Sequence, residues 1–395
     1  MRKKTNIFGY ILLVSITFFI TLNAFAKTIS DERSTSTRRK PCCGAKEPFI
    51  VLGYLRPNEF EDIDKMDLSK TNYINLSFAN INEDGRLMFK KDFKPLVKKL
   101  RSKDIRVMMA IGGGKVHGKT ADYWRKHLSD PYRSKLVANM VQYVEKHKLD
   151  GIDVDFENQF LTSLGENFNL FVLDLQKSLH AKNKQITAAF PCRRINANVS
   201  KEAIGAFDFI NIMSYGTKGP WRPDNPGQHS PMSLVKTVND FWVKEQGVPH
   251  DKIVFGLPFY GFDFDQMKGN KKGGVIWSKI IKKNPEYAYI DQVGQLWYNG
   301  IPTIAKKTHE ALKLFGGVMV WSYGTDVYND MSLLKTINQV IEAGLRENQD
   351  IQTFYQDGDG DGYGDLNKPF QAYNTPKGYV ANRLDTNDRD ATIHP

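Results

Sequence analysis

Apolar and acidic residues alternate strictly from Ile152 to Glu157. Because successive side chains of a β-strand point to opposite faces, one face of this segment carries three apolar side chains and the other carries Asp153, Asp155 and Glu157. Stacked like charges raise the pKa of at least one carboxyl, and a carboxyl that stays protonated near neutral pH can act as a general acid. The pattern predicts a strand with a chemically active face. A half-exposed strand with an acidic solvent face is the alternative.

The surrounding segments predict a repeated β/α unit. Apolar residues recur at helical spacing over 134–148 and 166–182, on either side of the acidic strand. Short apolar runs typical of buried strands occur at 50–55, 73–78, 105–111, 152–156, 185–190, 207–213, 253–257 and 318–321. Eight strands over roughly 275 residues predict the α/β class and a (β/α)8 TIM barrel, in which functional residues stand at the C-terminal strand ends.

Several of the predicted strands end in short motifs rich in glycine and aromatic residues. The fourth ends in DGIDVDFE (150–157), and the others are LGY (52–54), SFA (77–79), IGG (111–113), MSY (213–215), GLPFYG (256–261) and GGVMVW (316–321). Taken in the order in which they occur along the chain, these motifs resemble glycoside hydrolase family 18, the chitinase family, over residues 48–345. The resemblance implies a retaining glycosidase that hydrolyses β-1,4 bonds between N-acetylglucosamine units of a polysaccharide or oligosaccharide, without a cofactor.

The resemblance also implies roles for individual residues. Glu157 would protonate the glycosidic oxygen, and Asp155 would orient the substrate's own 2-acetamido group, which acts as the nucleophile in this family. Asp153 would share a proton with Asp155. Tyr215 would hold the acetamido carbonyl, and Trp321 would give the sugar an apolar floor, although a core position is the alternative for Trp321. The other implied substrate contacts are Tyr54, Phe78, Met213 and Trp221.

Three positions depart from the family pattern. Ala110 stands where a serine usually bonds the inner aspartate, Gly216 replaces a substrate-contacting aspartate, and Phe156 replaces a tryptophan or tyrosine. We therefore expect Asp153 to lack one hydrogen-bond partner. Because Glu157 is intact, we expect an enzyme rather than a catalytically silent lectin on the same barrel. Asp150 is interpreted as a structural carboxylate.

The segment between the seventh and eighth strands predicts an open groove. Residues 258–315 must hold the loop and helix of one β/α unit, which leaves little room for the α+β insertion that walls the clefts of some relatives. A shallow groove suits endo-cleavage. Trp221 is the favoured aromatic platform along it, whereas Trp277 and Trp297 are as well explained by core positions.

Two alternative activities remain open. An endo-β-N-acetylglucosaminidase that acts on N-glycan cores would share the acetamido chemistry. Residues 113–120 (GGKVHGKT) also fit the phosphate-loop pattern G-x-x-x-x-G-K-[ST]. We disfavour a nucleotide site because the first glycines coincide with the strand-end motif and because the predicted export would separate the protein from ATP.

The N-terminal region predicts export. Basic residues at 2–4 precede an apolar run at 7–22, and AFA at 24–26 has the small-x-small form of a cleavage site. We predict a signal peptide at 1–26, a linker at 27–47 and a secreted protein, extracellular or periplasmic, with no stable membrane span after cleavage. An uncleaved anchor is the alternative.

Charge and cysteine content add little to this interpretation. The net charge is +11, of which three positive charges lie in the predicted signal peptide, leaving +8. Because chitin is neutral, we interpret this charge as a solvated exterior, with attraction to anionic cell walls as the alternative and no nucleic-acid partner. Cys42, Cys43 and Cys192 are too few for a disulfide framework, and their pairing and the oligomeric state stay open.

The composition changes over residues 350–395. Acidic residues alternate with glycines in DGDGDGYGD (357–365), a pattern that supplies oxygen ligands and tight turns as calcium loops require. Lys368 stands at the twelfth position, where an EF-hand needs glutamate, and the segment instead resembles thrombospondin type 3 repeats. We expect Ca²⁺ at this segment, and a disordered acidic tail is the alternative. The predicted ligands are Asp357, Asp359, Asp361 and Asp365.

Overall fold

The computed structural model describes residues 49–193, 199–266, 273–344, 352–372, 375 and 378–393. The predicted signal peptide and linker, with Cys42 and Cys43, lie outside these residues. Among the cysteines, Cys192 is described, and it is buried and unpaired. None of the helices in the described ranges is long and apolar enough to span a membrane.

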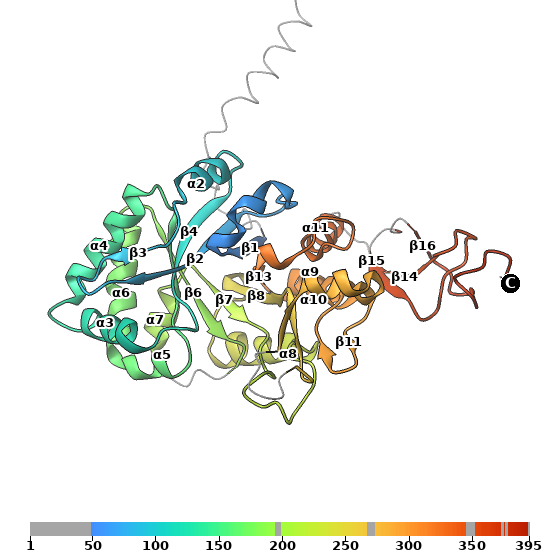
Figure 1. Ribbon diagram of the computed structural model, residues 1–395. Coiled ribbons are helices and arrows are strands. Elements are labelled where there is room, and N and C mark those ends of the chain that lie inside the picture. Colours follow the sequence, from blue (N-terminus) through green and yellow to red (C-terminus); the bar gives the residue numbers. More distant parts are fainter. Residues whose placement is uncertain are drawn as a thin grey trace, which may run out of the picture. The chain divides into compact units, whose positions relative to one another are not determined.

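Parallel strands form a closed barrel, with each strand beside its neighbour in the chain (Figure 1). Pairing of the first strand with both the second and the last closes the barrel. The prediction of a TIM barrel is confirmed. The strands are β1 (Ile50–Leu55), β2 (Tyr73–Ile81), β4 (Arg106–Gly112), β5 (Gly151–Asp155), β6 (Gln185–Pro191), β7 (Phe209–Met213), β8 (Ile253–Pro258) and β13 (Gly317–Trp321), with the short β3 (Leu87–Met88) antiparallel to β2.

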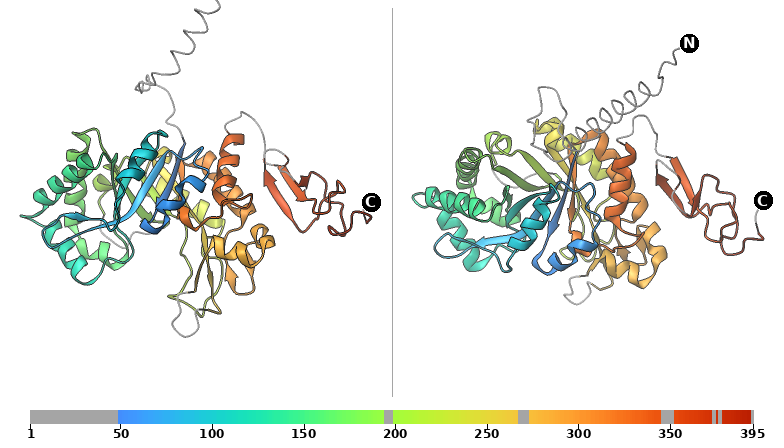
Figure 2. Two further views of the ribbon diagram at one scale, coloured as in Figure 1. Left: turned by 45° about the horizontal axis from the view of Figure 1, so that its top comes forward. Right: turned by 90° about the horizontal axis from the view of Figure 1, so that it is seen from above.

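Helices surround the barrel. Figure 2 shows α3 to α6, teal to green, along one side and α9 to α11, orange, along another. The α-helices are α2 (Lys94–Arg101), α3 (Gly118–Leu128), α4 (Arg133–Lys146), α5 (Asn158–Leu164), α6 (Glu166–His180), α7 (Lys201–Gly205), α8 (Ser233–Val238), α9 (Trp277–Lys283), α10 (Ile301–Leu314) and α11 (Leu333–Gly344). Short helical turns η1 (Pro57–Lys65), η2 (Asn239–Glu245), η3 (His250–Lys252), η4 (Pro285–Tyr289) and η5 (Tyr323–Thr325) lie between them.

The alternation in β5 decides which side chains face the helices. Ile152 and Val154 are buried in the core between the sheet and the helices. Phe156, just after the strand, packs edge-on against Trp124 of α3 with 4.9 Å between ring centres. The opposite face of each strand fills the barrel interior, where the buried hydrophobic residues are Leu52, Tyr54, Tyr73, Met108, Ala110, Phe209, Val254 and Met319.

The segment between β8 and β13 holds more than the predicted loop and helix. Four short strands, β9 (Tyr260–Asp263), β10 (Gly274–Ile276), β11 (Gln292–Val293) and β12 (Leu296–Trp297), form an antiparallel sheet in the order β10-β9-β12-β11. The prediction of little room for an α+β insertion was therefore wrong. Antiparallel strands of two to four residues need little chain, so a small sheet fits in the same segment as α9 and α10.

The C-terminal segment forms a three-stranded antiparallel sheet of β14 (Gln352–Gln356), β15 (Pro369–Ala372) and β16 (Tyr379–Val380). Its aromatic side chains Phe354, Phe370 and Tyr379 join the main hydrophobic core. The Lys368 ammonium group lies 3.7 Å from the Glu286 carboxylate of η4. The strands therefore attach the acidic loop between β14 and β15 to the α10 side of the barrel.

Candidate active site

Strand β5 carries the central carboxyls. Asp153 and Asp155 are 0% and 4% exposed and face the barrel interior, as the alternation predicted. Glu157 follows the strand and directly precedes α5. The three carboxyls therefore lie one above another toward the C-terminal end of the barrel, where this fold places its chemistry.

Asp153 is surrounded by hydrogen-bond donors from three other strands. The hydroxyls of Tyr54 on β1 and Thr187 on β6 each donate to its carboxylate at 2.6 Å, and the Asn211 amide on β7 donates at 3.0 Å. Burial raises the pKa of Asp153, and these hydrogen bonds oppose the rise. The expectation that Ala110 leaves Asp153 short of a partner was therefore wrong.

Asp155 and Glu157 are held toward their protonated forms. Burial raises the pKa of Asp155 well above its ordinary value, and the charges of Glu157 and Asp153 raise it further. Asp155 Oδ1 has no hydrogen-bond partner among the described residues. Burial also raises the pKa of Glu157 to about 7. The site can thus keep a proton on Glu157 near neutral pH and offers one free acceptor on Asp155.

A glycine loop after β4 lies directly beside Glu157. A Cβ atom on Gly114 would lie 2.9 Å from Glu157 Oε1, and one on Gly112 would lie 2.4 Å from the Asp155 carbonyl oxygen. Gly112 and Gly113 also have φ of +96° and +84°, which side-chain-bearing residues rarely adopt. Glycine is therefore required where the loop passes the carboxyls.

Tyr215, two residues after β7, completes this part of the groove. Its hydroxyl lies 3.7 Å from Met319 Sδ, and its ring meets Tyr260 edge-on at 6.1 Å. Burial raises the pKa of Tyr215 well above its ordinary value, and nearby Tyr260 and Asp155 add to the rise. The hydroxyl therefore stays neutral and can donate a hydrogen bond to a ligand.

A buried polar network supports the backbone before Tyr215. Lys307 of α10 is 0% exposed and donates to Ser230 Oγ at 2.6 Å and to Asn299 Oδ1 at 2.7 Å. Ser230 Oγ in turn donates to the Ser214 carbonyl oxygen at 2.6 Å. Burial lowers the pKa of Lys307 to about 7. The network ties α10 to the end of β7 and thereby fixes the position of Tyr215.

Aromatic rings form one half of the groove. Trp321 stacks on Phe78 with 5.5 Å between ring centres and 23° between ring planes, and it meets Tyr54 edge-on at 5.5 Å. All three rings line a cavity of about 820 Å³ together with Asp155 and Glu157. The predicted substrate contacts Tyr54, Phe78 and Trp321 are thus brought together beside the carboxyls.

A second cavity continues the groove. It measures about 1060 Å³, is lined by Trp221, and shares Glu157, Met213, Tyr215 and Tyr260 with the first cavity. Trp221 is 58% exposed and available as a platform. By contrast, Trp277 is 1% exposed in the core, and Trp297 packs against the cluster of Phe262 and Phe264.

Asp150 lies at the other end of β5 and has structural partners. Its carboxylate accepts from Arg101 at 2.7 Å and from the Val107 N–H at 2.9 Å. These bonds join the start of β5 to β4 and α2. The interpretation of Asp150 as a structural carboxylate agrees with this arrangement.

Several residues that contact the site were missed by sequence reasoning. Thr187 and Asn211 stand as single polar residues within apolar runs, and that pattern could have indicated an interior face with a polar partner. Tyr260 belongs to the GLPFYG motif, yet no local pattern indicates that its side chain lies in the groove. Nothing in the pattern pointed to Lys307, whose importance depends on burial.

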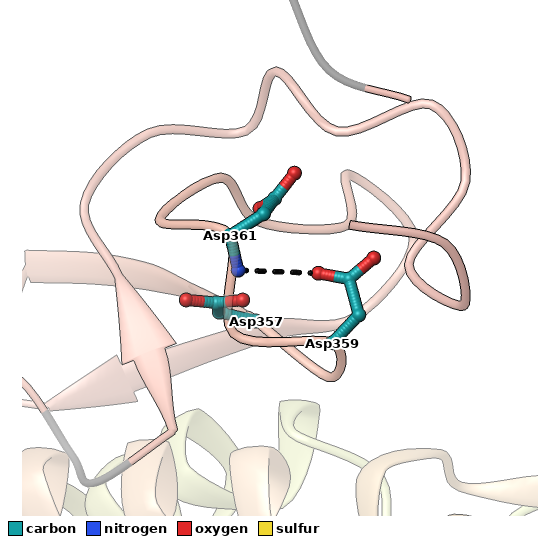
Figure 3. Close-up of side chains that lie close together, drawn as sticks. All are labelled: Asp357, Asp359 and Asp361. Carbon is teal, nitrogen blue, oxygen red and sulfur yellow. Dashed lines mark hydrogen bonds between the residues drawn. The ribbon is translucent and has the colours of Figure 1, made fainter. Parts of the chain in front are cut away.

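The acidic loop of the C-terminal segment brings carboxylates together. One carboxylate oxygen from each of Asp357, Asp359 and Asp361 lies within 4.8 Å of the other two. Figure 3 shows these three side chains close together on the loop. Asp359 belongs to a second such group with Asp385 and Asp388, which sequence reasoning missed. The predicted ligand Asp365 is in neither group, and its carboxylate lies 3.8 Å from Lys368. The two groups could hold a cation through oxygen ligands.

Comparisons with known proteins identify relatives of the barrel. The family model "Glycosyl hydrolases family 18" matches residues 50–326. The crystal structure of the GH18 chitinase ChiB from the chitin utilization locus of Flavobacterium johnsoniae is 35% identical, covers 74% of this chain and 94% of that chain, and gives a TM-score of 0.71. A chitinase from Bacteroides thetaiotaomicron is 26% identical, covers 77% of this chain and 99% of that chain, and gives a TM-score of 0.66.

Curated relatives are more distant. The endochitinase of Manduca sexta is 26% identical over 247 residues, which are 54% of this chain and 44% of the relative. Probable chitinase 2 of Drosophila melanogaster is 25% identical over 284 residues, which are 56% of each chain. The chain thus spans about half the length of these two relatives.

Proposed function

The chain belongs to glycosyl hydrolase family 18, and from this membership we propose that it is a secreted, retaining chitinase-like hydrolase that cleaves β-1,4 bonds between N-acetylglucosamine units. The observation that carries the proposal is the stack of Asp153, Asp155 and Glu157 in a groove with an aromatic floor. A carboxyl with a pKa of about 7 beside a second carboxyl suits acid–base chemistry on an acetal.

The first chemical step would break the glycosidic bond by substrate assistance. Glu157 gives its proton to the leaving oxygen while the carbonyl oxygen of the 2-acetamido group attacks C1 of the same sugar. The free acceptor on Asp155 receives the acetamido N–H and stabilises the oxazolinium ion. The Tyr215 hydroxyl donates to the acetamido oxygen. Because the nucleophile belongs to the substrate, no covalent enzyme intermediate forms.

The second step would hydrolyse the oxazolinium ion. Glu157, now ionised, takes a proton from water as the water oxygen bonds to C1, and the acetamido group is restored. Two displacements at C1 give net retention of configuration. Asp153, with its three donors, can hold or release a proton for Asp155 as the charge on the acetamido group appears and disappears. This chemistry needs no cofactor.

The remaining parts of the proposal concern the ends of the chain. Residues 1–26 would direct export to the extracellular or periplasmic space, and residues 27–47 would link the signal to the barrel. The acidic loop would bind Ca²⁺ through Asp357, Asp359 and Asp361. Asp385 and Asp388 replace Asp365 in the proposed ligand set because their oxygens approach Asp359.

Product analysis on matched oligosaccharides tests the activity. We expect chitotetraose to be cleaved with retained configuration, cellotetraose to be inert because it lacks the acetamido group, and a thiazoline analogue to inhibit. Efficient cleavage of cellotetraose, or a covalent adduct on Asp155, would contradict the substrate-assisted route. Release of glycan from a high-mannose glycopeptide would favour the endo-β-N-acetylglucosaminidase alternative. Binding of chitotetraose without cleavage would favour the lectin.

A further inference from the structure

The two cavities of the groove differ in the charges that line them. The larger cavity is lined by Arg193 and Arg222 beside Trp221, and among its lining residues Glu157 is the only carboxyl group. The smaller cavity contains Asp155 as well as Glu157. A formal positive charge therefore accumulates on one side of the cleavage point.

The proposed chemistry assigns a sugar to each cavity. Asp155 and Trp321 line the smaller cavity alone, so the sugar whose acetamido group attacks lies there. Glu157 lines both cavities, which places the scissile oxygen at their junction. The leaving-group sugar then extends into the larger cavity, toward Trp221 and the two arginines. This assignment rests on the proposed function.

Neither arginine has an anionic partner among the residues that the structure describes. Both side chains are exposed, and no carboxylate of a described residue lies within ion-pair distance of either guanidinium. Nearby Lys218 differs, because its ammonium group bonds Asn225 Oδ1 and the Pro226 carbonyl oxygen at 2.9 Å. The arginines are thus available to a ligand.

The neighbouring residues also favour an anion in the larger cavity. Gly216 also lines it and brings no side-chain charge that would oppose a negative ligand. Burial raises the pKa of the Glu157 carboxyl to about 7, which reduces the negative charge that this side chain places in the cavity. The aromatic side chains of Trp221, Tyr260 and Phe262 line the rest of this cavity and add no negative charge to it.

We propose that the leaving-group side of the groove recognises a sugar that carries a carboxylate, so that the preferred substrate is an acidic β-1,4-linked N-acetylhexosamine glycan rather than wholly neutral chitin. Arginine presents its N–H donors in a planar fork that matches a carboxylate, and wholly neutral chitin offers the arginines no counter-charge. Two of the chain's basic residues therefore have a specific location within the groove.

A matched set of tetrasaccharides separates charge from bulk. The charged probe alternates N-acetylglucosamine with N-acetylmuramic acid, its 3-O-lactyl ether. The neutral probe is the same tetrasaccharide with each lactyl carboxylate converted to the amide, and chitotetraose is the parent. Affinity is measured by calorimetry at low and high ionic strength on the Glu157→Gln full-length protein, and kcat/KM is measured on the wild type.

We expect the charged probe to bind about 3–10-fold more tightly than its amide at low ionic strength, because two solvent-accessible ion pairs contribute modestly each. The preference should fall in high salt, since the Debye length shortens. In the double variant Arg193→Gln/Arg222→Gln the ratio of the two affinities should approach one. Wild-type kcat/KM should show the same preference.

A control pair removes the same charge elsewhere. Lys103→Gln/Lys146→Gln changes two exposed lysines that follow α2 and end α4, at the end of the barrel opposite the groove. That variant should keep the preference for the charged probe. Equal affinities for the charged and amidated probes, or a ratio that the arginine substitutions leave unchanged, would overturn this inference. Failure of the wild type to cleave chitotetraose would contradict the proposed function instead, while the affinity ratio still decides the inference.

Discussion

Carboxyl groups crowd together in two regions of this chain, at the end of β5 and in the loop after β14. In the barrel they are buried, side-chain hydroxyls and an amide surround the lowest one, and burial raises the pKa values of Asp155 and Glu157. In the loop they stand near the surface and accept from backbone N–H groups, as Asp357 does from Gly360 and Gly362.

The difference shows how surroundings decide what crowded carboxyls can bind. Burial makes the charged form costly, so repulsion on β5 is relieved by protons, and a group that holds a proton near pH 7 can deliver it. In the loop, burial and the charges of Asp361, Asp385 and Asp388 raise the pKa of Asp359, and a cation held between these oxygens would relieve that repulsion. Glycines let the loop turn tightly enough to direct several oxygens toward one point.

The largest effect is expected from a variant of the barrel carboxyls that can no longer donate a proton to the substrate. Glu157→Gln keeps the shape of the side chain but cannot donate an acidic proton, so turnover of chitotetraose should fall about 10²–10⁴-fold. Oligosaccharide binding should persist by calorimetry. The exposed control Glu145→Gln should leave turnover unchanged. Near-wild-type hydrolysis by Glu157→Gln would show that another group is the acid.

The pH profile of the reaction also distinguishes the barrel carboxyls from the loop carboxyls. Since Glu157 must be protonated and its pKa is raised to about 7, kcat/KM should decline above pH 7, by about tenfold per pH unit at the limit. The measurement is the initial rate from pH 4 to pH 10. Asp357→Asn, in the other cluster, should give the same profile. A rate that stays constant to pH 9 would exclude the raised pKa.

The hydrogen bonds to Asp153 should matter for both stability and activity. Thr187→Val removes a buried donor, so the free energy of unfolding should fall by about 1–3 kcal/mol in a urea titration. Without this donor the pKa of Asp153 rises further, and the pH profile should shift as well.

Thr303→Val provides a matched control for that change. It removes a 2.6 Å hydrogen bond to Asp291 outside the groove, so it should lower stability without moving the pH profile. If both valine variants give the same profile, Asp153 takes no part in the titration that governs activity.

The smallest effect on the reaction is expected from the loop cluster. Ca²⁺ should protect residues 350–395 from limited proteolysis, and a hundredfold excess over Kd would stabilise the folded segment by about 2.7 kcal/mol, while hydrolysis by the barrel stays unchanged. Asp359→Ala removes the residue common to both oxygen groups and should abolish protection, whereas Asp365→Ala should not. If the rate of proteolysis is the same with Ca²⁺ and with a chelator, the loop is an acidic tail that does not bind Ca²⁺.

The sequence predicted those features that depend on local periodicity. The alternation at 152–157 placed three carboxyls on the interior face, and eight apolar runs located the barrel strands. The strand ends then indicated where the groove lies. These features can be predicted because the hydrophobic periods of a strand, two residues, and of a helix, 3.6 residues, are visible within a short stretch of sequence.

Features that depend on register between distant strands could not be predicted. Tyr54, Thr187 and Asn211 lie far apart in sequence and meet at Asp153 because their strands share one barrel interior. Their presence overturned the expectation drawn from Ala110. Asp385 likewise lies close to Asp359 although the two residues are 26 positions apart along the chain, and no local spacing predicts that contact.

The loop after β4 bears on how short sequence patterns are interpreted. The string GGKVHGKT satisfies a nucleotide-binding pattern, yet its first glycine, Gly113, is required by the Phe78 ring, which a Cβ atom would approach within 2.6 Å. Gly118, the other fixed glycine of that pattern, would meet nothing within 4 Å. The two glycines thus have different structural surroundings although both fit the same short pattern, so the pattern alone does not indicate a nucleotide site. We therefore expect Gly118→Asn to be tolerated, because asparagine adopts a positive φ more readily than other side-chain-bearing residues. A side chain at Gly113 should instead destabilise the fold, because it would collide with the Phe78 ring.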